Sequence, residues 1–287
     1  MDAGIGQAPP AVPLRPLGVA ELLDGAIRTV RYNARTSFAL ALPVAVVRAS
    51  IVAVVAYHSV GNQDLAIVQI LASVFVSAMF GTLLAGLLAP AYTDEMLGHR
   101  LSPAQTLRRV GRSGFGLLGL IVMVAVAQEV GVVLLFVGGA WLWGIWAVAA
   151  PVVSVERLGP RAALARSFDL VRTQFWRVWG IRSLRWVLST VLGLFVSLPF
   201  TLLAAAISDS DPFATSGGQI GNVSLYVTLT ALGSVVALTI VGPISAAVDA
   251  LLYLDLRMRR EGLDLVIGLP PLPAATAGAP RQAITAW

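Results

Sequence analysis

Six long apolar runs separated by polar segments dominate the chain, and they predict membrane-spanning helices. The runs cover approximately residues 36–57, 66–91, 115–136, 138–155, 183–207 and 223–254. A hydrocarbon core of about 30 Å requires roughly 20 apolar residues in a helix. One helix over the whole apolar block 115–155 would be about 60 Å long. We therefore predict two spans there, joined by a tight turn at Gly138 and Gly139.

Short amphipathic segments precede the first, third and fifth runs. In the second of these segments, Ser102, Pro103 and Gln105 offer an N-cap, a proline in the first turn and a capping-box partner. In the third, Pro160 is expected to begin a helix that continues through residue 178. Its expected apolar face consists of Leu164, Phe168, Val171, Phe175 and Val178, with Arg166, Asp169, Arg172 and Arg177 facing away. We predict that all three helices lie in the membrane interface.

The order of one amphipathic helix, one span out and one span back thus recurs three times. The second and fourth runs also end alike, because Pro90 and Pro151 are each followed by acidic residues. This pattern favours three parallel repeats about the membrane normal. Any topology with alternating loops also looks repetitive, and that reading stays open. The predicted class is an all-α integral membrane protein with about six transmembrane helices and three amphipathic interfacial helices.

The charge distribution predicts the topology. All but Arg48 of the 20 basic residues lie before the first run, after the sixth, in the gaps after the second and fourth or, for Arg185, at the start of the fifth run. The ionisable residues in the gaps after the first, third and fifth runs are only His58 and aspartates. Positive charge retained on one side is typical of cytoplasmic segments. We expect a multi-pass protein of a bacterial cytoplasmic membrane with both termini in the cytoplasm.

Composition narrows the class of partner. With 57% hydrophobic and 12% charged residues, the chain is too apolar for a soluble globule. Its pI near 10.4 is better explained by anionic lipid headgroups than by nucleic acid, because the arginines flank the spans. The absence of cysteine excludes disulfides, thiolate nucleophiles and cysteine metal sites. We expect a single helical membrane domain at 18–267, with disordered cytoplasmic segments at 1–17 and 268–287.

Three stretches carry a family resemblance. They are RPLGVAELLDGAIRTVRYN near the start, APVVSVERLGPRAALARSFDLVRTQFWRVWGI in the middle and LLYLDLRMRREGLDL near the end. Together they resemble actinobacterial multi-pass proteins described as the glycerophosphoryl diester phosphodiesterase membrane domain or as domains of unknown function. The resemblance covers most of residues 14–265. It implies a helical membrane module, sometimes found beside a soluble phosphodiesterase domain, and it implies no particular activity.

Catalytic chemistry is not expected in this chain. A phosphodiesterase of that class needs metal-binding carboxylates and paired histidines. The two histidines, His58 and His99, are predicted on opposite sides of the membrane and cannot meet. No phosphate-binding loop, nucleophile elbow or metal-binding helix motif is present. We therefore expect no catalytic residues, no metal and no cofactor.

Two ionisable residues fall inside predicted spans, where a charge costs roughly 2.5 to 3.5 kcal/mol on insertion scales. Arg48 lies about 12 residues into the first span, and Glu129 about 14 residues into the third. Both spans run outward, so the two side chains are expected at similar depth and could form an ion pair. The pair could fix helix packing or form a polar transport site. A third reading is that the two never meet.

Six arginines of the amphipathic segments are candidate headgroup contacts. They are Arg108, Arg109, Arg112, Arg166, Arg172 and Arg177. The leading expectation is a non-enzymatic membrane scaffold or complex subunit that engages anionic lipids, protein partners or a second copy of itself. The alternative is a small transporter or lipid translocator with its polar site near Arg48 and Glu129. A membrane-embedded lipid-modifying enzyme is the third reading.

Overall fold

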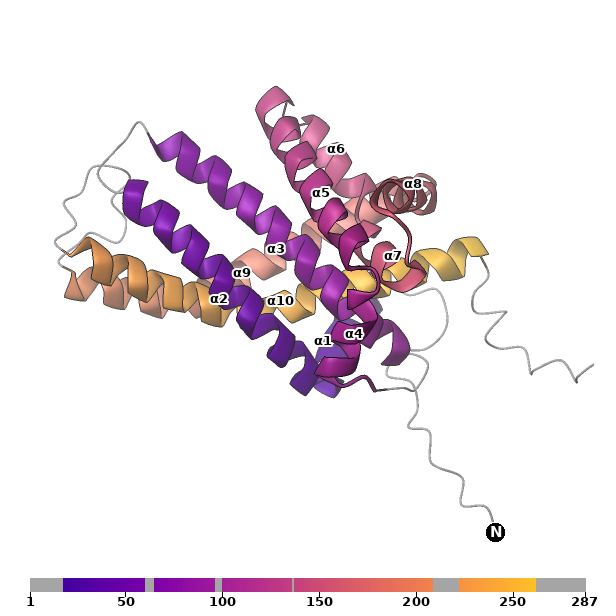
Figure 1. Ribbon diagram of the computed structural model, residues 1–287, viewed down its shortest axis with the longest axis horizontal. Helices are drawn as coiled ribbons and strands as arrows, with labels where there is room; N and C mark the ends of the chain where they lie inside the picture. Colours follow the sequence, from indigo (N-terminus) through magenta and orange to yellow (C-terminus); the bar gives the residue numbers. More distant parts are fainter. Residues whose placement is uncertain (1–17, 60–64, 96–99, 136, 209–221, 262–287) are drawn as a thin grey trace, which may run out of the picture.

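The computed structural model describes residues 18–59, 65–95, 100–135, 137–208 and 222–261. Within these ranges the chain is built of α-helices, which are connected by short segments (Figure 1). In chain order they are α1 (Val19–Tyr32), α2 (Ala34–Ser59), α3 (Ala66–Glu95), α4 (Pro103–Gly111), α5 (Gly114–Leu135), α6 (Val137–Ile145), α7 (Ala149–Glu156), α8 (Pro160–Val171), α9 (Phe175–Ile207) and α10 (Val223–Glu261).

The six predicted spans are confirmed as helical segments long and apolar enough to cross a membrane. They are α2, α3, α5, α6 together with α7, α9 and α10. The chain is therefore an all-α, multi-pass membrane protein. The last two spans are longer than predicted, because α9 already begins at Phe175 and α10 continues to Glu261. The expected terminal segments 1–17 and 268–287 lie outside the described residues.

The sequence predicts one helix for the fourth span, but the structure has two, α6 and α7. Between α6 and α7 the amides of Ala147 and Ala149 bond to carbonyls three residues back, at 3.3 Å each, in place of the α-helical bonds. Pro151 follows in the first turn of α7. Proline has no amide hydrogen, and its ring clashes with the carbonyl four residues earlier. The break one turn before Pro151 follows from these two properties.

The sequence predicts the turn between the third and fourth spans at Gly138 and Gly139, but in the structure it does not lie there. Both glycines belong to α6, and α5 ends earlier, at Leu135. Gly139 instead allows α6 to pack closely against α5, because a Cβ on Gly131 of α5 would stand 2.5 Å from the Cα of Gly139. The two helices therefore touch backbone to backbone. Small residues permit this close approach between membrane helices.

The short helices follow the prediction except in the third unit. At the start of α4 the backbone N–H of Ser102 donates to the side-chain Oε1 of Gln105, and the backbone N–H of Gln105 donates to the Ser102 hydroxyl. This is the predicted capping box. By contrast, α8 ends at Val171 rather than near residue 178, and a turn separates it from α9. Leu164, Val171 and Val178 are buried as predicted, whereas Phe168 is exposed and Arg166 is half-buried, which is the reverse of the prediction for these two residues. Arg166 turns inward because carboxylates lie there, as described below.

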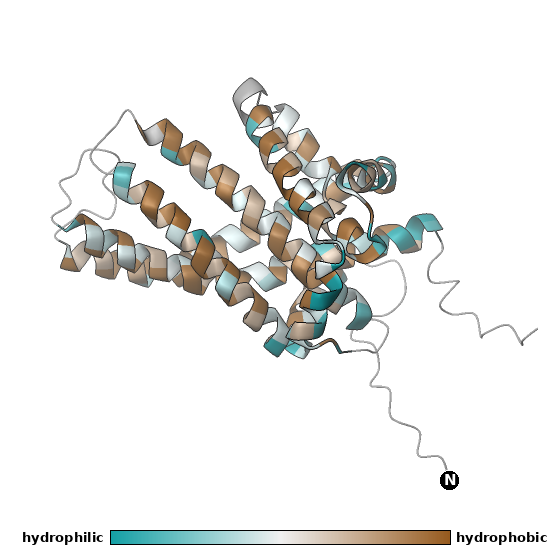
Figure 2. Ribbon diagram, in the orientation of Figure 1, coloured by the Kyte–Doolittle hydropathy of each residue, from teal (hydrophilic) through white to brown (hydrophobic). Residues whose placement is uncertain are grey.

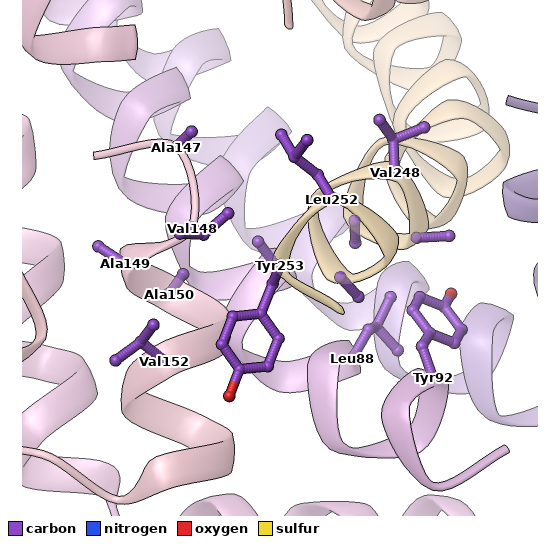
Figure 3. Packing of buried hydrophobic residues seen from close by; sticks show 14 of the residues in the cluster. Leu88, Tyr92, Ala147, Val148, Ala149, Ala150, Val152, Val248, Leu252 and Tyr253 are labelled. Carbon is purple, nitrogen blue, oxygen red and sulfur yellow. The ribbon is translucent and has the colours of Figure 1, made fainter. Parts of the chain in front are cut away.

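Helix α10 is the centre of the structure. It packs against α1, α2, α3, α7, α8 and α9. Its buried stretch from Ala246 to Leu256 forms the core with residues of α3 and α7, among them Leu88, Tyr92 and Val152 (Figure 3). This core lies toward one end of the molecule. A helix enclosed by so many neighbours fixes the positions of the side chains at its own C-terminal end.

Helices α1, α4, α7 and α8 and the last turns of α10 lie toward that same end, and hydrophilic residues gather there (Figure 2). We call it the arginine-rich end. The opposite halves of the long helices are mostly apolar, and on α9 many apolar residues away from α10 are exposed. A wide apolar helix surface that the protein leaves uncovered is what a surrounding lipid phase requires.

Candidate functional site

A closed ring of hydrogen bonds joins five side chains at the arginine-rich end. Arg166 of α8 donates through Nε to Glu156 at 3.2 Å and through Nη2 to Glu261. Glu261 also accepts from Arg257 Nε at 2.9 Å. Arg257 donates to the hydroxyl of Tyr253 at 3.2 Å, and Tyr253 donates to Glu156 at 2.8 Å. The ring therefore ties α7 and α8 to the last turns of α10.

The charges of this ring balance. Two arginines face two glutamates, and the tyrosine hydroxyl bridges one of each. Burial by itself would lower the pKa of the Arg166 guanidinium, but the carboxylates of Glu261 and Glu156 raise it above its ordinary value. Arg166 is therefore charged at any physiological pH. Half-buried charges stabilise a fold only when partners satisfy them, as they do here.

Two aspartates of α10 continue the network deeper in the bundle. Asp255 is fully buried and bonds to Arg177 at 2.5 Å and to Arg259 at 3.0 Å. Six residues earlier on α10, Asp249 pairs with Arg185 at 3.4 Å. Arg182 donates to the carbonyl of Trp143 at 2.7 Å. These contacts fasten α9 to α10 and α6.

A second polar cluster joins the first three helices to α4. Asn33, directly after α1, donates to Glu95 at the end of α3. Asp94 pairs with Arg109 of α4. Ser37 and Tyr92 share a hydrogen bond of 2.9 Å inside the core. The end of α1, the start of α2 and α4 are thereby held against the end of α3.

The two clusters share a rule that matches the sequence repeat. In each of the first two units, an acidic residue four or five positions after the span's proline pairs with an arginine of the following short helix. These pairs are Asp94 with Arg109 and Glu156 with Arg166. In the third unit, Glu261 binds back to Arg166 and Asp255 binds Arg177. The repeated carboxylates therefore act as anchors for the short helices.

The six arginines predicted to contact headgroups separate into two groups. Arg109, Arg166 and Arg177 are at least partly buried and are bound to carboxylates of the spans. Arg108 and Arg112 are exposed and form no ion pair within the described part of the chain; Arg172 is exposed and lies 3.7 Å from Asp169. Helical periodicity places an arginine on a face but does not show which acidic residue another helix brings to it.

The structure does not bring Arg48 and Glu129 into an ion pair. Arg48 donates through Nη2 to the hydroxyl of Ser77 on α3 at 2.9 Å. The Glu129 Oε1 atom is buried and has no hydrogen-bond partner among the residues described. Next to the Arg48 contact, toward the far end of α2 and α3, lies a cavity of 310 Å³ between these helices, partly lined by Gln69 and Ser73. A polar site at this depth thus involves α2 and α3.

Among the described residues, the structure does not assemble a group of side chains that resembles a hydrolytic active site. His58 lies in the last turn of α2 against the ring of Tyr57, and His99 falls outside the described residues. No group of three metal-ligating side chains forms among the residues described.

Two features of the site were missed from the sequence. Tyr253 lies at the end of the sixth apolar run, where nothing local indicates that its hydroxyl completes the ring. Arg161, in the first turn of α8, is not among the candidate headgroup arginines, yet it borders the groove described below. Its position directly after Pro160, at the start of a helix, is the signal that could have identified it.

Comparison with known proteins adds no further constraint. No protein-family model, no curated protein and no solved structure matches the chain. Function is therefore argued from the geometry.

Proposed function

We propose that this protein is a non-enzymatic scaffold or complex subunit of the bacterial cytoplasmic membrane, which engages anionic lipids, protein partners or both at its cytoplasmic face. The arginine-rich end would be that face, with both termini in the cytoplasm. The resemblance to the glycerophosphoryl diester phosphodiesterase membrane domain agrees with such a role, because it implies a helical membrane module and no particular activity.

One observation carries the proposal: ion pairs hold the helices of the arginine-rich end together, yet further arginines remain exposed on its surface. The acidic residues at the ends of the spans are occupied by half-buried arginines. A second set is exposed without an ion pair in the described ranges: Arg31, Arg35, Arg108, Arg112, Arg157 and Arg161. Each exposed arginine near an anionic membrane surface contributes about 1 kcal/mol of attraction.

The sidedness is tested by labelling single cysteines, which the natural chain lacks. We expect membrane-impermeant reagents to label cysteines placed near residues 62, 138 and 215 in intact cells. Cysteines near 105, 170 and 275 should react only after the membrane is opened. Labelling of any of the latter three from outside would overturn the proposed orientation.

The lipid and partner role is tested by purification from native membranes. The variant Arg108→Gln with Arg112→Gln removes two exposed cations from α4, and Arg108→Lys with Arg112→Lys keeps the charge. We expect the glutamine pair to lose anionic lipid or crosslinked partners relative to the natural chain, and the lysine pair to keep them. Equal lipids and partners in all three samples would contradict the proposal.

A transporter or lipid translocator is the second candidate, supported by the contact of Arg48 with Ser77 beside the cavity between α2 and α3. An arginine in the middle of a span is costly unless it serves a site or a partner. The test is the transbilayer movement of a fluorescent anionic lipid in proteoliposomes. Movement that is lost in Arg48→Met and kept in Arg108→Gln would favour this candidate over a scaffold.

A further inference from the structure

A groove runs along the outside of the bundle where the loop before α8 meets α5. Its volume is 860 Å³, and it is lined on one side by Phe115, Leu118 and Val122 of α5. The other side is the first turn of α8, with Pro160 and Arg161. None of the ring residues described above lines it, so the groove is a separate feature of the arginine-rich end.

Glycines of α5 bring the two walls together. A Cβ on Gly116 would stand 3.2 Å from the carbonyl oxygen of Leu158, and one on Gly119 would stand 3.1 Å from Pro160. Both distances are shorter than ordinary packing contacts, so the loop lies directly on the helix. On the far side of the same loop, the ring through Glu156 and Arg166 holds it in place. The groove is therefore a fixed part of the fold.

The apolar wall continues along α5 in the direction of the membrane. Phe115 is 95% exposed, and Leu118, Val122 and Val126 follow on the same helical face, each about half exposed. From Phe115 to Val126 this stripe is about 16 Å long. That length is close to one leaflet of a hydrocarbon core of about 30 Å. The stripe thus fits an acyl chain that begins at the interface.

The rim of the groove carries positive charge. Arg161 is exposed, forms no ion pair among the described residues and borders the groove directly after Pro160, which lies against Gly119 of α5. The lining contains no acidic side chain. A cation beside an apolar stripe of leaflet length complements a phospholipid with an anionic headgroup. A second membrane helix fits less well, because helix contacts in membranes favour small residues over Phe115 and Leu118.

We infer that this groove is a binding site for one anionic phospholipid, with its phosphate on Arg161 and an acyl chain along Phe115, Leu118 and Val122. The inference rests on the proposed lipid-engaging role and names one place where it occurs. The loop between α7 and α8 forms one wall, so a bound lipid would join α5 to α8 from outside the bundle. The ring of Glu156 and Arg166 joins the same loop to α10 from inside.

The test uses the purified full-length chain, delipidated in detergent and titrated with phosphatidylglycerol or phosphatidylcholine, with bound lipids counted by native mass spectrometry. We expect a first phosphatidylglycerol to bind more tightly than phosphatidylcholine. Arg161→Gln should weaken that first binding step about fivefold, the effect of one interfacial cation, and Arg161→Lys should largely restore it. Val122→Trp should also weaken it by filling the groove.

Controls separate the groove from the wider proposal. Val191→Trp, at an exposed apolar position of α9, should leave the first binding step unchanged. If Arg161→Gln and Val122→Trp bind the first lipid as the natural chain does, the groove is not the site. Weakening by Arg108→Gln with Arg112→Gln alone would then overturn the groove while the lipid-engaging surface stands. A dimer that Val122→Trp disrupts, with lipid binding unchanged, would assign the groove to a second copy.

Discussion

The hydroxyl of Tyr253 donates to Glu156 at 2.8 Å and so joins the end of α10 to the end of α7 across 97 positions of sequence. Glu156 also holds Arg166, which in turn holds Glu261. The bond of Tyr253 therefore closes a ring that three helices share. Its loss should be felt by all of them.

Replacing Tyr253 with phenylalanine tests this ring. Because Glu156 would lose a donor in a largely buried place, the free energy of unfolding should fall by about 1.5 to 3 kcal/mol. Glu156→Gln should also destabilise, and the double variant should lose less than the sum of the two. The measurement is denaturant unfolding in mixed micelles, followed by circular dichroism. Tyr57→Phe, at an exposed tyrosine of α2, is the control and should have little effect.

The buried carboxylate of Asp255 should be the most sensitive charge of the network. Asp255→Ala leaves Arg177 and Arg259 without this partner, and we expect a loss of about 3 kcal/mol in the free energy of unfolding. Asp24→Ala is the matched control, because its pair with Arg28 is 60% and 64% exposed. An exposed pair contributes well under about 1 kcal/mol. Similar losses for both variants would show that burial does not govern these pairs.

Two glycines that lie close together, Gly131 of α5 and Gly138 of α6, should respond differently to replacement by alanine. Gly131→Ala forces a methyl group against the backbone of Gly139 and should destabilise by about 1 to 3 kcal/mol. Gly138→Ala meets nothing within 4 Å and should be neutral, or stabilising by up to about 1 kcal/mol through helix propensity. Thermal unfolding of both proteins in the same detergent decides the matter. Equal tolerance at both positions would refute the backbone contact between α5 and α6.

The partners of Arg48 can be identified by double-mutant cycles. Because Arg48 bonds to Ser77, the effects of Arg48→Met and Ser77→Ala should be non-additive, with a coupling of about 0.5 to 2 kcal/mol. The effects of Arg48→Met and Glu129→Leu should add within about 0.5 kcal/mol. Unfolding in bicelles provides all of these values. Strong coupling to Glu129 together with additivity at Ser77 would instead support the ion pair that the sequence suggested.

Local patterns were sufficient for most elements of this fold. Spans of about 20 apolar residues, the capping box at Ser102 and the proline at the start of α8 all appear where the sequence predicts them. These features depend on hydrogen bonds and burial within a few residues. The break between α6 and α7 also has a local signal, in Pro151. The continuous helices through Pro90 and Pro243 show why that signal alone is insufficient.

The pairing of charges required the tertiary structure. Arg109 and Arg108 are neighbours on one helix, yet among the described residues only Arg109 meets a carboxylate, Asp94. Similarly, Arg48 and Glu129 share a predicted depth, but depth does not determine which faces two helices turn toward each other. The rotation of each helix is fixed by packing around α10, which involves residues far apart in sequence.

The sequence by itself therefore determined the class, the six spans and the arginine-rich end of this protein, because apolar length and charge position are properties of single segments. The tertiary structure alone decided which arginines are bound inside the protein and which remain on its surface. It also created the groove beside Arg161, whose two walls come from α5 and from the loop before α8. Such a site exists only after helix packing has set the distance between elements that no local pattern relates.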